Sequence, residues 1–256
     1  MIDPRAIISP KAQLASDVTV GPFSIIGPEV QIGAGTVVGP HVVINGPTTI
    51  GADNHIFQFA SIGDAPQDKK YKGEPTRLEI GDRNVFRENC TVNRGTTHGK
   101  GVTRVGDDNL FLAYSHVGHD CQVGSKTVFS NCAALGGHVE IGDWVILGGL
   151  TAVHQFVKIG AHAFLAGGAI VQRDVPPYVL VAGNPAQPHA VNSEGLKRRG
   201  FTEEQIHNVR NAYRILYRSE LKLADAMEKL CALGETQPEV KFFADFIGTS
   251  TRSLVR

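Results

Sequence analysis

An aliphatic or phenylalanine side chain recurs at every sixth position over most of this 256-residue chain. The period holds in three blocks, and no polar residue occupies any of its 25 positions. The first block is Ile8, Leu14, Val20, Ile26, Ile32, Val38, Ile44, Ile50, Ile56 and Ile62; the second is Ile80, Phe86 and Val92; the third is Val105, Phe111, Val117, Val123, Phe129, Leu135, Ile141, Leu147, Val153, Ile159, Leu165 and Val171. A period of six fits neither an α-helical turn nor a hairpin meander. It is typical of a hexapeptide β-helix.

Each hexad is expected to form one short strand and one corner, and three hexads to close a triangular coil of about 18 residues. The periodic side chains then point into the prism and stack on their equivalents in the next coil. Gly, Asn and Asp near the corners suit turns with positive φ. Because neighbouring strands lie about 4.8 Å apart, some ten coils would make a rod of roughly 50 Å.

Two polar stretches interrupt the period. Residues 63–79 keep the six-residue phase but lack aliphatic side chains at positions 68 and 74, which predicts an excursion loop that replaces a coil. His98 to Thr103 is a shorter insertion, which we hold responsible for a slip of one residue in the phase. Loops that project from a rigid scaffold often carry ligand contacts, although either stretch can equally be a solvated bulge.

The repeat is expected to end at Asp174-Val-Pro-Pro-Tyr178, because prolines stop strand pairing. The remainder has helical patterns: a capping box at Thr202-Glu-Glu-Gln205, a second helix over about 223–233 and a third after Pro238. We therefore predict a mainly β protein with two domains. Residues 1–190 would form a left-handed parallel β-helix of hexapeptide repeats with an excursion loop at 63–79, and residues 191–256 a C-terminal α-helical bundle.

Charge and cysteine content exclude several function classes. Lys plus Arg and Asp plus Glu both number 25, so there is no overall signature of nucleic-acid binding. The four cysteines form no C-x-x-C pair. The longest apolar run, Trp144 to Val153, is far shorter than the roughly 20 residues of a membrane helix. Nothing resembles a signal peptide, so we expect a cytoplasmic protein without a membrane span.

The chemistry is expected to lie with the histidines of the later coils. His116, His119 and Asp120 lie within five residues of one another. His138 follows His119 by one coil plus one residue, and His154 lies in the coil after that. Three interpretations are open: a zinc site, a solvated histidine ladder, or acid–base catalysis. We favour His119 as a general base and predict no metal, because few further ligands lie nearby in the sequence.

No serine or cysteine lies in a nucleophile-elbow context, and no phosphate-binding glycine loop is present. Direct transfer of an activated group to a bound hydroxyl is therefore the expected reaction class. Backbone N–H groups would stabilise the oxyanion, and Gly137, just before His138, is well placed to offer one. Successive strand residues point to opposite faces, so Asp120 can touch His119 only where a corner intervenes.

Specific motifs resemble one family over the whole chain. They are Gln67-Asp68-x-Lys70, Gly73-Glu-Pro-Thr-Arg77, His116-x-x-His119-Asp120-Cys121, Gly136-Gly-His138, Thr151-Ala-Val-His-Gln155, Asp174-Val-Pro-Pro-Tyr178 and Asn192-x-Glu-Gly-Leu-Lys-Arg-Arg-Gly200. Together with the repeat, they are similar to the UDP-N-acetylglucosamine 3-O-acyltransferases of lipid A biosynthesis. The left hand of the β-helix is implied by this resemblance and not by the period. Asn93 is a departure, because the family often has histidine there, and we place it outside the His119 site.

The resemblance implies roles for individual residues. His119 would be the general base on the glucosamine 3-hydroxyl, Asp120 would support it, and the Gly137 N–H would stabilise the oxyanion. The implied contacts to the sugar nucleotide or to the acyl donor are Gln67, Asp68, Lys70, His116, His138, His154, Gln155, Asn192, Glu194, Arg198 and Arg199. Gly167 would lie where the acyl chain ends. The planar guanidinium groups of Arg198 and Arg199 independently suit a diphosphate.

The implied reaction moves an (R)-3-hydroxyacyl group from acyl carrier protein to UDP-N-acetylglucosamine, as the first step of lipid A synthesis. No cofactor is expected beyond the phosphopantetheine of the carrier protein, and the implied assembly is a homotrimer with sites between subunits. A related N- or O-acyltransferase that acts on another sugar nucleotide is one alternative. A non-catalytic β-solenoid scaffold is the other, although such a rod should show regular polar ladders and no histidine cluster.

Overall fold

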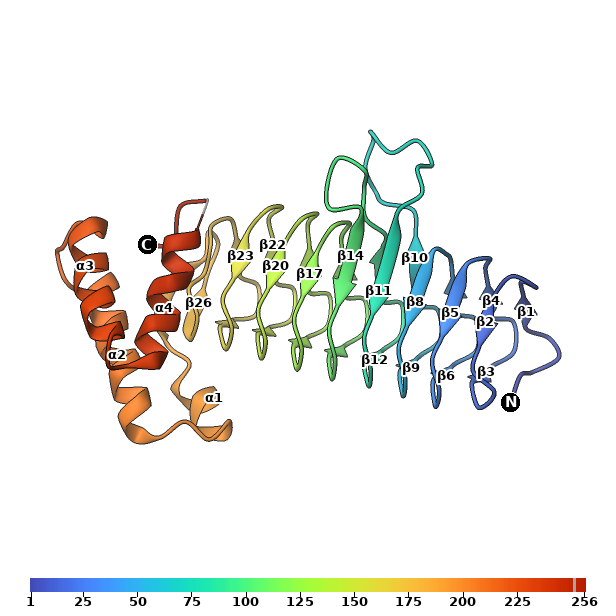
Figure 1. The fold of residues 1–256 in the computed structure, drawn as a ribbon, viewed down its shortest axis with the longest axis horizontal. Coiled ribbons are helices and arrows are strands. Elements are labelled where there is room, and N and C mark those ends of the chain that lie inside the picture. The colour runs from blue at the N-terminus through green and yellow to red at the C-terminus, as the bar shows by residue number, and fades with distance from the viewer. Residues whose placement is uncertain (251) are drawn as a thin grey trace.

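The computed structural model describes residues 1–250 and 252–256, which form a straight parallel β-helix followed by a small group of helices (Figure 1). Three sheets line the rod, and each coil adds one strand to each of them. The first sheet contains β1 (Ile7–Ile8), β4 (Ile25–Ile26), β7 (Val43–Ile44), β10 (Ser61–Asp64), β13 (Thr91–Asn93), β16 (His116–Val117), β19 (Ala134–Leu135), β22 (Ala152–Val153) and β25 (Ile170–Val171). The second contains β2 (Gln13–Leu14), β5 (Val30–Ile32), β8 (Thr48–Ile50), β11 (Arg77–Ile80), β14 (Val102–Val105), β17 (Gln122–Val123), β20 (Glu140–Ile141) and β23 (Lys158–Ile159).

The third sheet contains β3 (Thr19–Val20), β6 (Val37–Val38), β9 (His55–Ile56), β12 (Val85–Phe86), β15 (Leu110–Phe111), β18 (Val128–Phe129), β21 (Ile146–Leu147), β24 (Phe164–Leu165), β26 (Val179–Ala182) and β27 (Gln187–Val191). We call the corner between the first and second sheets the first corner, that between the second and third sheets the second corner, and that between the third and first sheets the third corner. Most of the predicted site residues of the rod lie at one of these corners, and His116 lies in β16 on the first sheet.

The core confirms the six-residue period. The periodic side chains point into the prism, and Phe86, Phe111 and Phe129 stack along its axis with ring centroids 4.7 and 4.6 Å apart. Only Ile8 and Leu14, in the open first coil, remain partly exposed. Burying one such side chain stabilises the fold by about 1.5–3 kcal/mol. The rod is therefore a rigid support for whatever its corners present.

The corners place bulky residues in the left-handed backbone region. His138, Trp144 and His162 all have φ near +60°, a conformation that favours Gly, Asn and Asp. Stacking against the coils on either side overrides that local preference. As a result, functional side chains occupy corner positions where the sequence alone favoured glycine, and they project away from the rod.

Both interruptions lie at the first corner. The expectation that residues 63–79 replace a coil was wrong. The strands β8 and β11 pair directly, with Ile50 opposite Ile80, so the excursion is an insertion within one coil. The strand β14 likewise pairs directly with β11, and the second insertion comprises residues 94–101, between β13 and β14. It was expected at His98 to Thr103, but Val102 and Thr103 belong to β14. Figure 1 shows the two loops side by side on the same edge of the rod.

The end of the rod also differs from the expectation. Beyond Pro176 and Pro177, the strand β26 still pairs in parallel with β24, and β27 then folds back antiparallel to β26. The prolines lack N–H donors, but Val179 to Ala182 do not, so the third sheet continues past them. The last strand ends at Val191.

Four helices follow: α1 (Ser193–Arg198), α2 (Glu203–Tyr217), α3 (Leu223–Gly234) and α4 (Pro238–Thr249). The capping box at the start of α2 is present as predicted, with Thr202 and Gln205 exchanging hydrogen bonds. The short helix α1 was not foreseen. Among the described residues no helix is long and apolar enough to span a membrane.

Candidate active site

The structure separates the predicted site residues into three groups. The larger group surrounds the first corner: Gln67, Asp68, Lys70, His116, His119, Asp120, Gly137, His138, His154 and Gln155. Arg199 and Asn192 lie at the second corner, where both contact His162, and Glu194 and Arg198 are exposed on α1 between them. Gly167 is at the third corner, in the turn between β24 and β25. One chain therefore does not bring all of them into one site.

His119 and Asp120 touch directly because the first corner separates them from a regular strand. The Nδ1 atom of His119 is 2.9 Å from Oδ2 of Asp120. The carboxylate is wholly buried, and the imidazole side chain is 14% exposed. Since a carboxylate accepts hydrogen bonds, Nδ1 carries the proton and Nε2 is left free to take one.

Asp120 is held in its ionised form. Burial by itself raises the pKa of this carboxyl group, but hydrogen bonds from His119 and Thr96 outweigh burial and lower the pKa to about 2. Thr96 and Lys100, which belong to the second insertion, were missed by sequence reasoning. Lys100 lay in the expected insertion, whereas Thr96 lies between the end of the second phase block and that insertion, so the period gave no sign of it.

The neighbouring histidines stay neutral more readily than free imidazole. Burial lowers the pKa of His116, whose Nδ1 lies 2.7 Å from the Thr91 hydroxyl. Burial also lowers the pKa of His138, even though its Nε2 is 3.8 Å from Asp120. The His138 ring stacks on Phe156 with centroids 4.3 Å apart. Both histidines are therefore suited to hydrogen bonding rather than to carrying charge.

His119 lies between two open cavities. One, of about 520 Å³, runs along the first sheet past His116, Ala134, Ala152 and His154. The other, of about 750 Å³, lies under the two inserted loops and is lined by Asp68, Lys70, His98 and His138. Gln67, His119 and Gln155 border both cavities. A proton acceptor at the junction of two cavities can act where two bound groups meet.

The two insertions are joined to each other beside this site. Nε2 of His98 is 2.9 Å from Oδ2 of Asp68, and the Lys70 N–H donates to the other oxygen of that carboxylate at 2.9 Å. The Lys70 N–H and His98 hydrogen bonds lower the pKa of Asp68. Both loops are thus tied down where they cover the larger cavity.

Asn93 corrects one sequence-based expectation. It was placed outside the His119 site, yet it lines the same cavity as His119 and His116. Its Nδ2 donates to the Ala65 carbonyl at 2.9 Å, and its Oδ1 has no hydrogen-bond partner in the described part of the chain. The expectation failed because Asn93 sits at the end of β13, immediately before the insertion that bends back over His119.

The second corner carries an aromatic and cationic cluster. Arg199 donates to Nδ1 of His162 at 3.1 Å, and its guanidinium lies over the Trp144 ring, 5.1 Å from the centroid. Burial and the nearby Arg199 charge lower the pKa of His162 to about 4. Asn192 caps α1 through the Gly195 N–H and donates to the His162 carbonyl. This cluster fixes the direction of Arg199.

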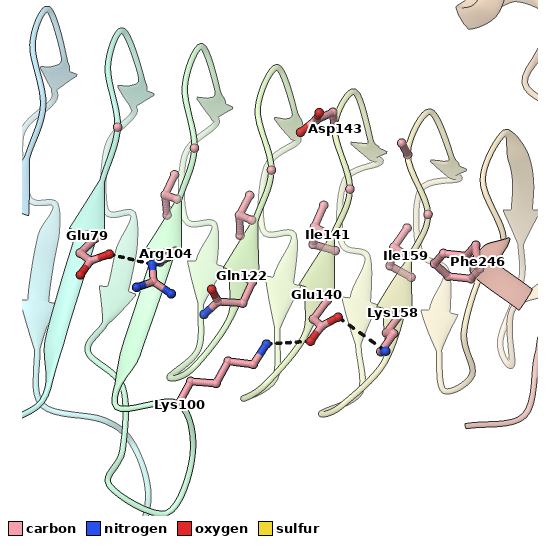
Figure 2. Close-up of a pocket in the computed structure, with 18 of the residues that line it drawn as sticks. Glu79, Lys100, Arg104, Gln122, Glu140, Ile141, Asp143, Lys158, Ile159 and Phe246 are labelled. Atoms are coloured by element: carbon pink, nitrogen blue, oxygen red, sulfur yellow. Dashed lines mark hydrogen bonds and ion pairs between the residues drawn. The ribbon is translucent and has the colours of Figure 1, made fainter. Parts of the chain in front are cut away.

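A cavity of about 860 Å³, larger than either cavity beside His119, lies on the second sheet, as Figure 2 shows, and holds none of the predicted site residues. Most of its charged side chains form ion pairs: Arg104 pairs with Glu79, and Lys100 and Lys158 pair with Glu140. Size alone would have pointed to the wrong face of the rod. The cavities at the histidine corner are smaller, but they are lined by His119, whose Nε2 is free to accept a proton.

A metal ion would find three potential ligands here, because atoms of His119, Asp120 and His138 lie within 4.8 Å of one another. The Asp120 oxygens, however, already accept hydrogen bonds from Thr96, Lys100 and His119. Cys121, the adjacent thiol, is also unsuited to catalysis, since burial raises its pKa to about 12. The site offers a base without a thiol nucleophile beside it.

A hexapeptide-repeat β-helix that holds an oriented histidine between two open cavities is the arrangement of a hexapeptide acyltransferase. Two family models match parts of the chain: one described as bacterial transferase hexapeptide (six repeats) over residues 11–46, and one described as Udp N-acetylglucosamine O-acyltransferase, domain 2, over residues 174–255. The second covers the end of the rod and the helices, where Asn192 and Arg199 lie.

Full-length relatives carry the same description. Two relatives, from Thiobacillus denitrificans and Janthinobacterium sp., are 53% and 55% identical to this chain. Each match covers 100% of this chain and 99% of the relative, and both relatives are named acyl-[acyl-carrier-protein]--UDP-N-acetylglucosamine O-acyltransferase. The crystal structure of the Francisella novicida UDP-N-acetylglucosamine acyltransferase superposes with a TM-score of 0.98 at 42% identity, covering 100% of this chain and 94% of that one. The chain belongs to the family of acyl-acyl carrier protein:UDP-N-acetylglucosamine O-acyltransferases, and its fold is the left-handed parallel β-helix that was expected.

Proposed function

We propose that this protein transfers an (R)-3-hydroxyacyl group from acyl carrier protein to the 3-hydroxyl of UDP-N-acetylglucosamine, the first step of lipid A synthesis. Family membership at 53–55% identity over the full chain supports this choice. The observation that carries the mechanism is the 2.9 Å contact that fixes His119 on Asp120 between two cavities.

In the proposed reaction the sugar hydroxyl attacks the thioester carbonyl carbon directly. Nε2 of His119 takes the hydroxyl proton as the new C–O bond forms, and Asp120 stabilises the resulting imidazolium. The carbonyl electrons move to the oxygen, which the Gly137 N–H stabilises. The C–S bond then breaks, and the leaving thiolate takes the proton back from His119. No covalent enzyme intermediate and no metal enters these steps.

The two cavities suit the two substrates. The cavity under the loops presents Asp68, Lys70 and His138, which match a polar sugar nucleotide. The cavity on the first sheet presents Ala134 and Ala152, whose small apolar side chains leave room for an acyl chain. His154 and Gln155 border that path, and Gly167 lies beyond it at the third corner. We assign the donor to the first sheet on this basis.

We also propose a homotrimer, which the outward side chains of the rod support. The second sheet faces outward with polar residues, namely Gln13, Gln31, Thr49, Glu79, Arg104, Gln122, Glu140 and Lys158. The third sheet faces outward mainly with Val37, Val85, Leu110, Val128, Ile146, Phe164 and Leu180, and the first with Ile7, Ile25, Val43, Ala134, Ala152 and Ile170. Two apolar faces on each rod suit a closed ring in which the third sheet of one protomer meets the first sheet of the next.

Such a ring would complete the site. It sets the second corner of one protomer, with Arg198, Arg199, Asn192 and Glu194, against the first corner of its neighbour, with His119. The separation of these groups within one chain is then expected, and the diphosphate would lie between protomers, facing the arginines.

Subunit complementation tests the composite site. Co-expressed His119→Ala and Arg199→Ala chains, carrying different tags, should regain activity in mixed trimers, because about one quarter of random interfaces combine an intact His119 with an intact Arg199. Each variant alone should be nearly inactive. If the mixed trimers are no more active than the parents, the site lies within one chain.

Mass spectrometry of the product tests the function itself. UDP-N-acetylglucosamine and its 3-amino counterpart are each incubated with a mixed pool of hydroxyacyl and acyl carrier proteins, and the expected product is UDP-N-acetylglucosamine that carries one ester-linked hydroxyacyl group. The alternatives give different outcomes: an amide on a 3-amino sugar nucleotide would identify a related N-acyltransferase. Absence of any acylated sugar nucleotide would leave the scaffold interpretation.

A further inference from the structure

The second insertion, residues 94–101, closes on the Asp120 carboxylate rather than standing free in solvent. The Thr96 N–H donates to both carboxylate oxygens at 3.0 Å, and the Thr96 hydroxyl donates to Oδ2 at 2.7 Å. The Lys100 N–H donates to Oδ1 at 2.9 Å. Thr96 and Asp120 are both wholly buried. A loop of this kind does not behave as a solvated bulge.

The loop is shaped so that its backbone can reach the carboxylate. A Cβ atom on Gly99 would lie 2.4–2.5 Å from the Asp120 carboxyl carbon and oxygens, so only glycine fits there. The N–H groups of Gly99 and Gly101 both bond to the Thr96 carbonyl, at 3.1 and 2.9 Å, which closes the turn. The loop therefore contributes a fixed set of donors and not a flexible cover.

Anchors on either side hold the loop in place. Lys100 Nζ reaches the second sheet and pairs with Glu140 Oε1 at 2.7 Å, as Figure 2 shows. His98 is joined to Asp68 of the larger loop. Because the donors are fixed at both ends, the plane of the Asp120 carboxylate is fixed too.

We infer that Thr96 is a positioning residue for the catalytic base: its hydroxyl and N–H orient the Asp120 carboxylate, which in turn fixes the tautomer and direction of His119. This inference rests on the proposed function, and it adds a residue of the inserted loop to the machinery. A carboxylate held by one imidazole alone can rotate about its side-chain torsions, whereas four further donor contacts remove that freedom. The insertion at the first corner thus serves chemistry at His119 rather than substrate contact alone.

The test is a double-mutant cycle on the full-length trimer. Thr96→Val keeps the shape and the N–H but removes the hydroxyl donor, and we expect kcat to fall roughly tenfold with KM for UDP-N-acetylglucosamine unchanged. Thr96→Ser restores the donor and should recover most of the activity. Thr36→Val is the matched control, because Thr36 is equally buried and hydrogen-bonded but lies in the early coils.

The decisive readout is non-additivity. In an Asp120→Asn background the carboxylate charge is gone, so Thr96→Val should lower kcat by less than about twofold further. If the two losses multiply, or if Thr96→Val matches Thr36→Val and leaves kcat unchanged, Thr96 does not act through Asp120. These outcomes differ from failure of the proposed function, in which the wild-type protein itself forms no acylated UDP-N-acetylglucosamine.

Discussion

The His119 imidazole packs directly against Gly137, one coil further along the rod. A Cβ atom added at Gly137 would lie 2.5 Å from Cε1 and Nε2 of His119, closer than any real contact. The base and the expected oxyanion donor are therefore adjacent, and the coil spacing sets their separation. This relationship explains why a glycine precedes His138.

Gly137→Ala should displace the imidazole while leaving the rod folded. We expect kcat to fall by about 10²-fold, the scale of lost general-base catalysis, with little change in the thermal unfolding midpoint. Steady-state kinetics and calorimetry measure the two quantities. Gly149→Ala is the control, because a Cβ there meets only the Asn131 carbonyl at 3.5 Å. Equal activity of the two variants would show that His119 tolerates displacement.

Metal removal should not change turnover. The Asp120 oxygens are occupied by hydrogen bonds from Thr96, Lys100 and His119, so the three-residue cluster has no free carboxylate ligand. Prolonged dialysis against EDTA, followed by elemental analysis, is the measurement. A loss of activity that stoichiometric zinc restores would overturn the metal-free mechanism.

Acid should destabilise the protein through His162. Its pKa is about 4 in the folded state against about 6.5 for an unperturbed histidine, so the unfolded chain binds more protons between these values. Stability therefore falls as the pH drops from 6.5 to 4, by at most about 3 kcal/mol from this residue. His116 and His138, whose pKa values burial also lowers, act in the same direction.

The measurement is the urea unfolding midpoint at pH 7, 5.5 and 4.5. His162→Asn cannot be protonated, and Asn tolerates the positive φ of this corner, so its midpoint should fall less over this range than that of the wild type. Asp120→Asn is the control, since the Asp120 pKa of about 2 confines its effect to pH values below about 4. Parallel curves for wild type and His162→Asn would remove His162 as the cause.

Gly167 should set the length of the acyl chain. A Cβ there meets the Gly149 carbonyl only at 3.4 Å, so a side chain fits without disturbing the coil and would project into the proposed acyl path. With glycine, a chain of about 14 carbons is expected. Four extra CH₂ groups favour the longer donor by roughly 3 kcal/mol before ordering costs.

Gly167→Met should shift the preference to about 10 carbons, and Gly167→Ala to an intermediate length, with His119 chemistry intact. Competition between carrier proteins of different chain length, followed by mass spectrometry, gives the preference. If the wild type already prefers 10-carbon donors and neither variant changes this, another residue such as His154 or Phe164 ends the path.

The sequence predicted the rod because each periodic side chain has the same buried environment, coil after coil. It located the first insertion but could not show that it is added to a coil rather than replacing one, since the 12 residues added between Ile50 and Ile80 are two hexads and leave the phase unchanged. The second insertion adds seven residues between Ile80 and Val105. Six of them make a whole hexad, so only the seventh is visible, as a slip of one residue in the phase. Thr96 carried no periodic signal, because its partner Asp120 is 24 residues away at a coil corner.

The histidine cluster was predictable from coil spacing, whereas the direct contact of Asp120 with His119 needed the corner geometry. Asp120 has a positive φ, which turns two consecutive side chains toward each other. The sequence did not predict that Arg199 and His119 lie at different corners. The helix α1 was not foreseen, and Arg199, which follows it, contacts His162 at the second corner.

The most direct test of His119 as the base is the turnover of the purified His119→Ala protein with saturating UDP-N-acetylglucosamine and hydroxyacyl carrier protein. We predict a fall in kcat of at least about 10²-fold, with the circular dichroism spectrum and sedimentation coefficient of the wild type. Turnover within a few fold of the wild-type value would contradict the account, because it would show that His119 is not needed to take the proton from the sugar hydroxyl.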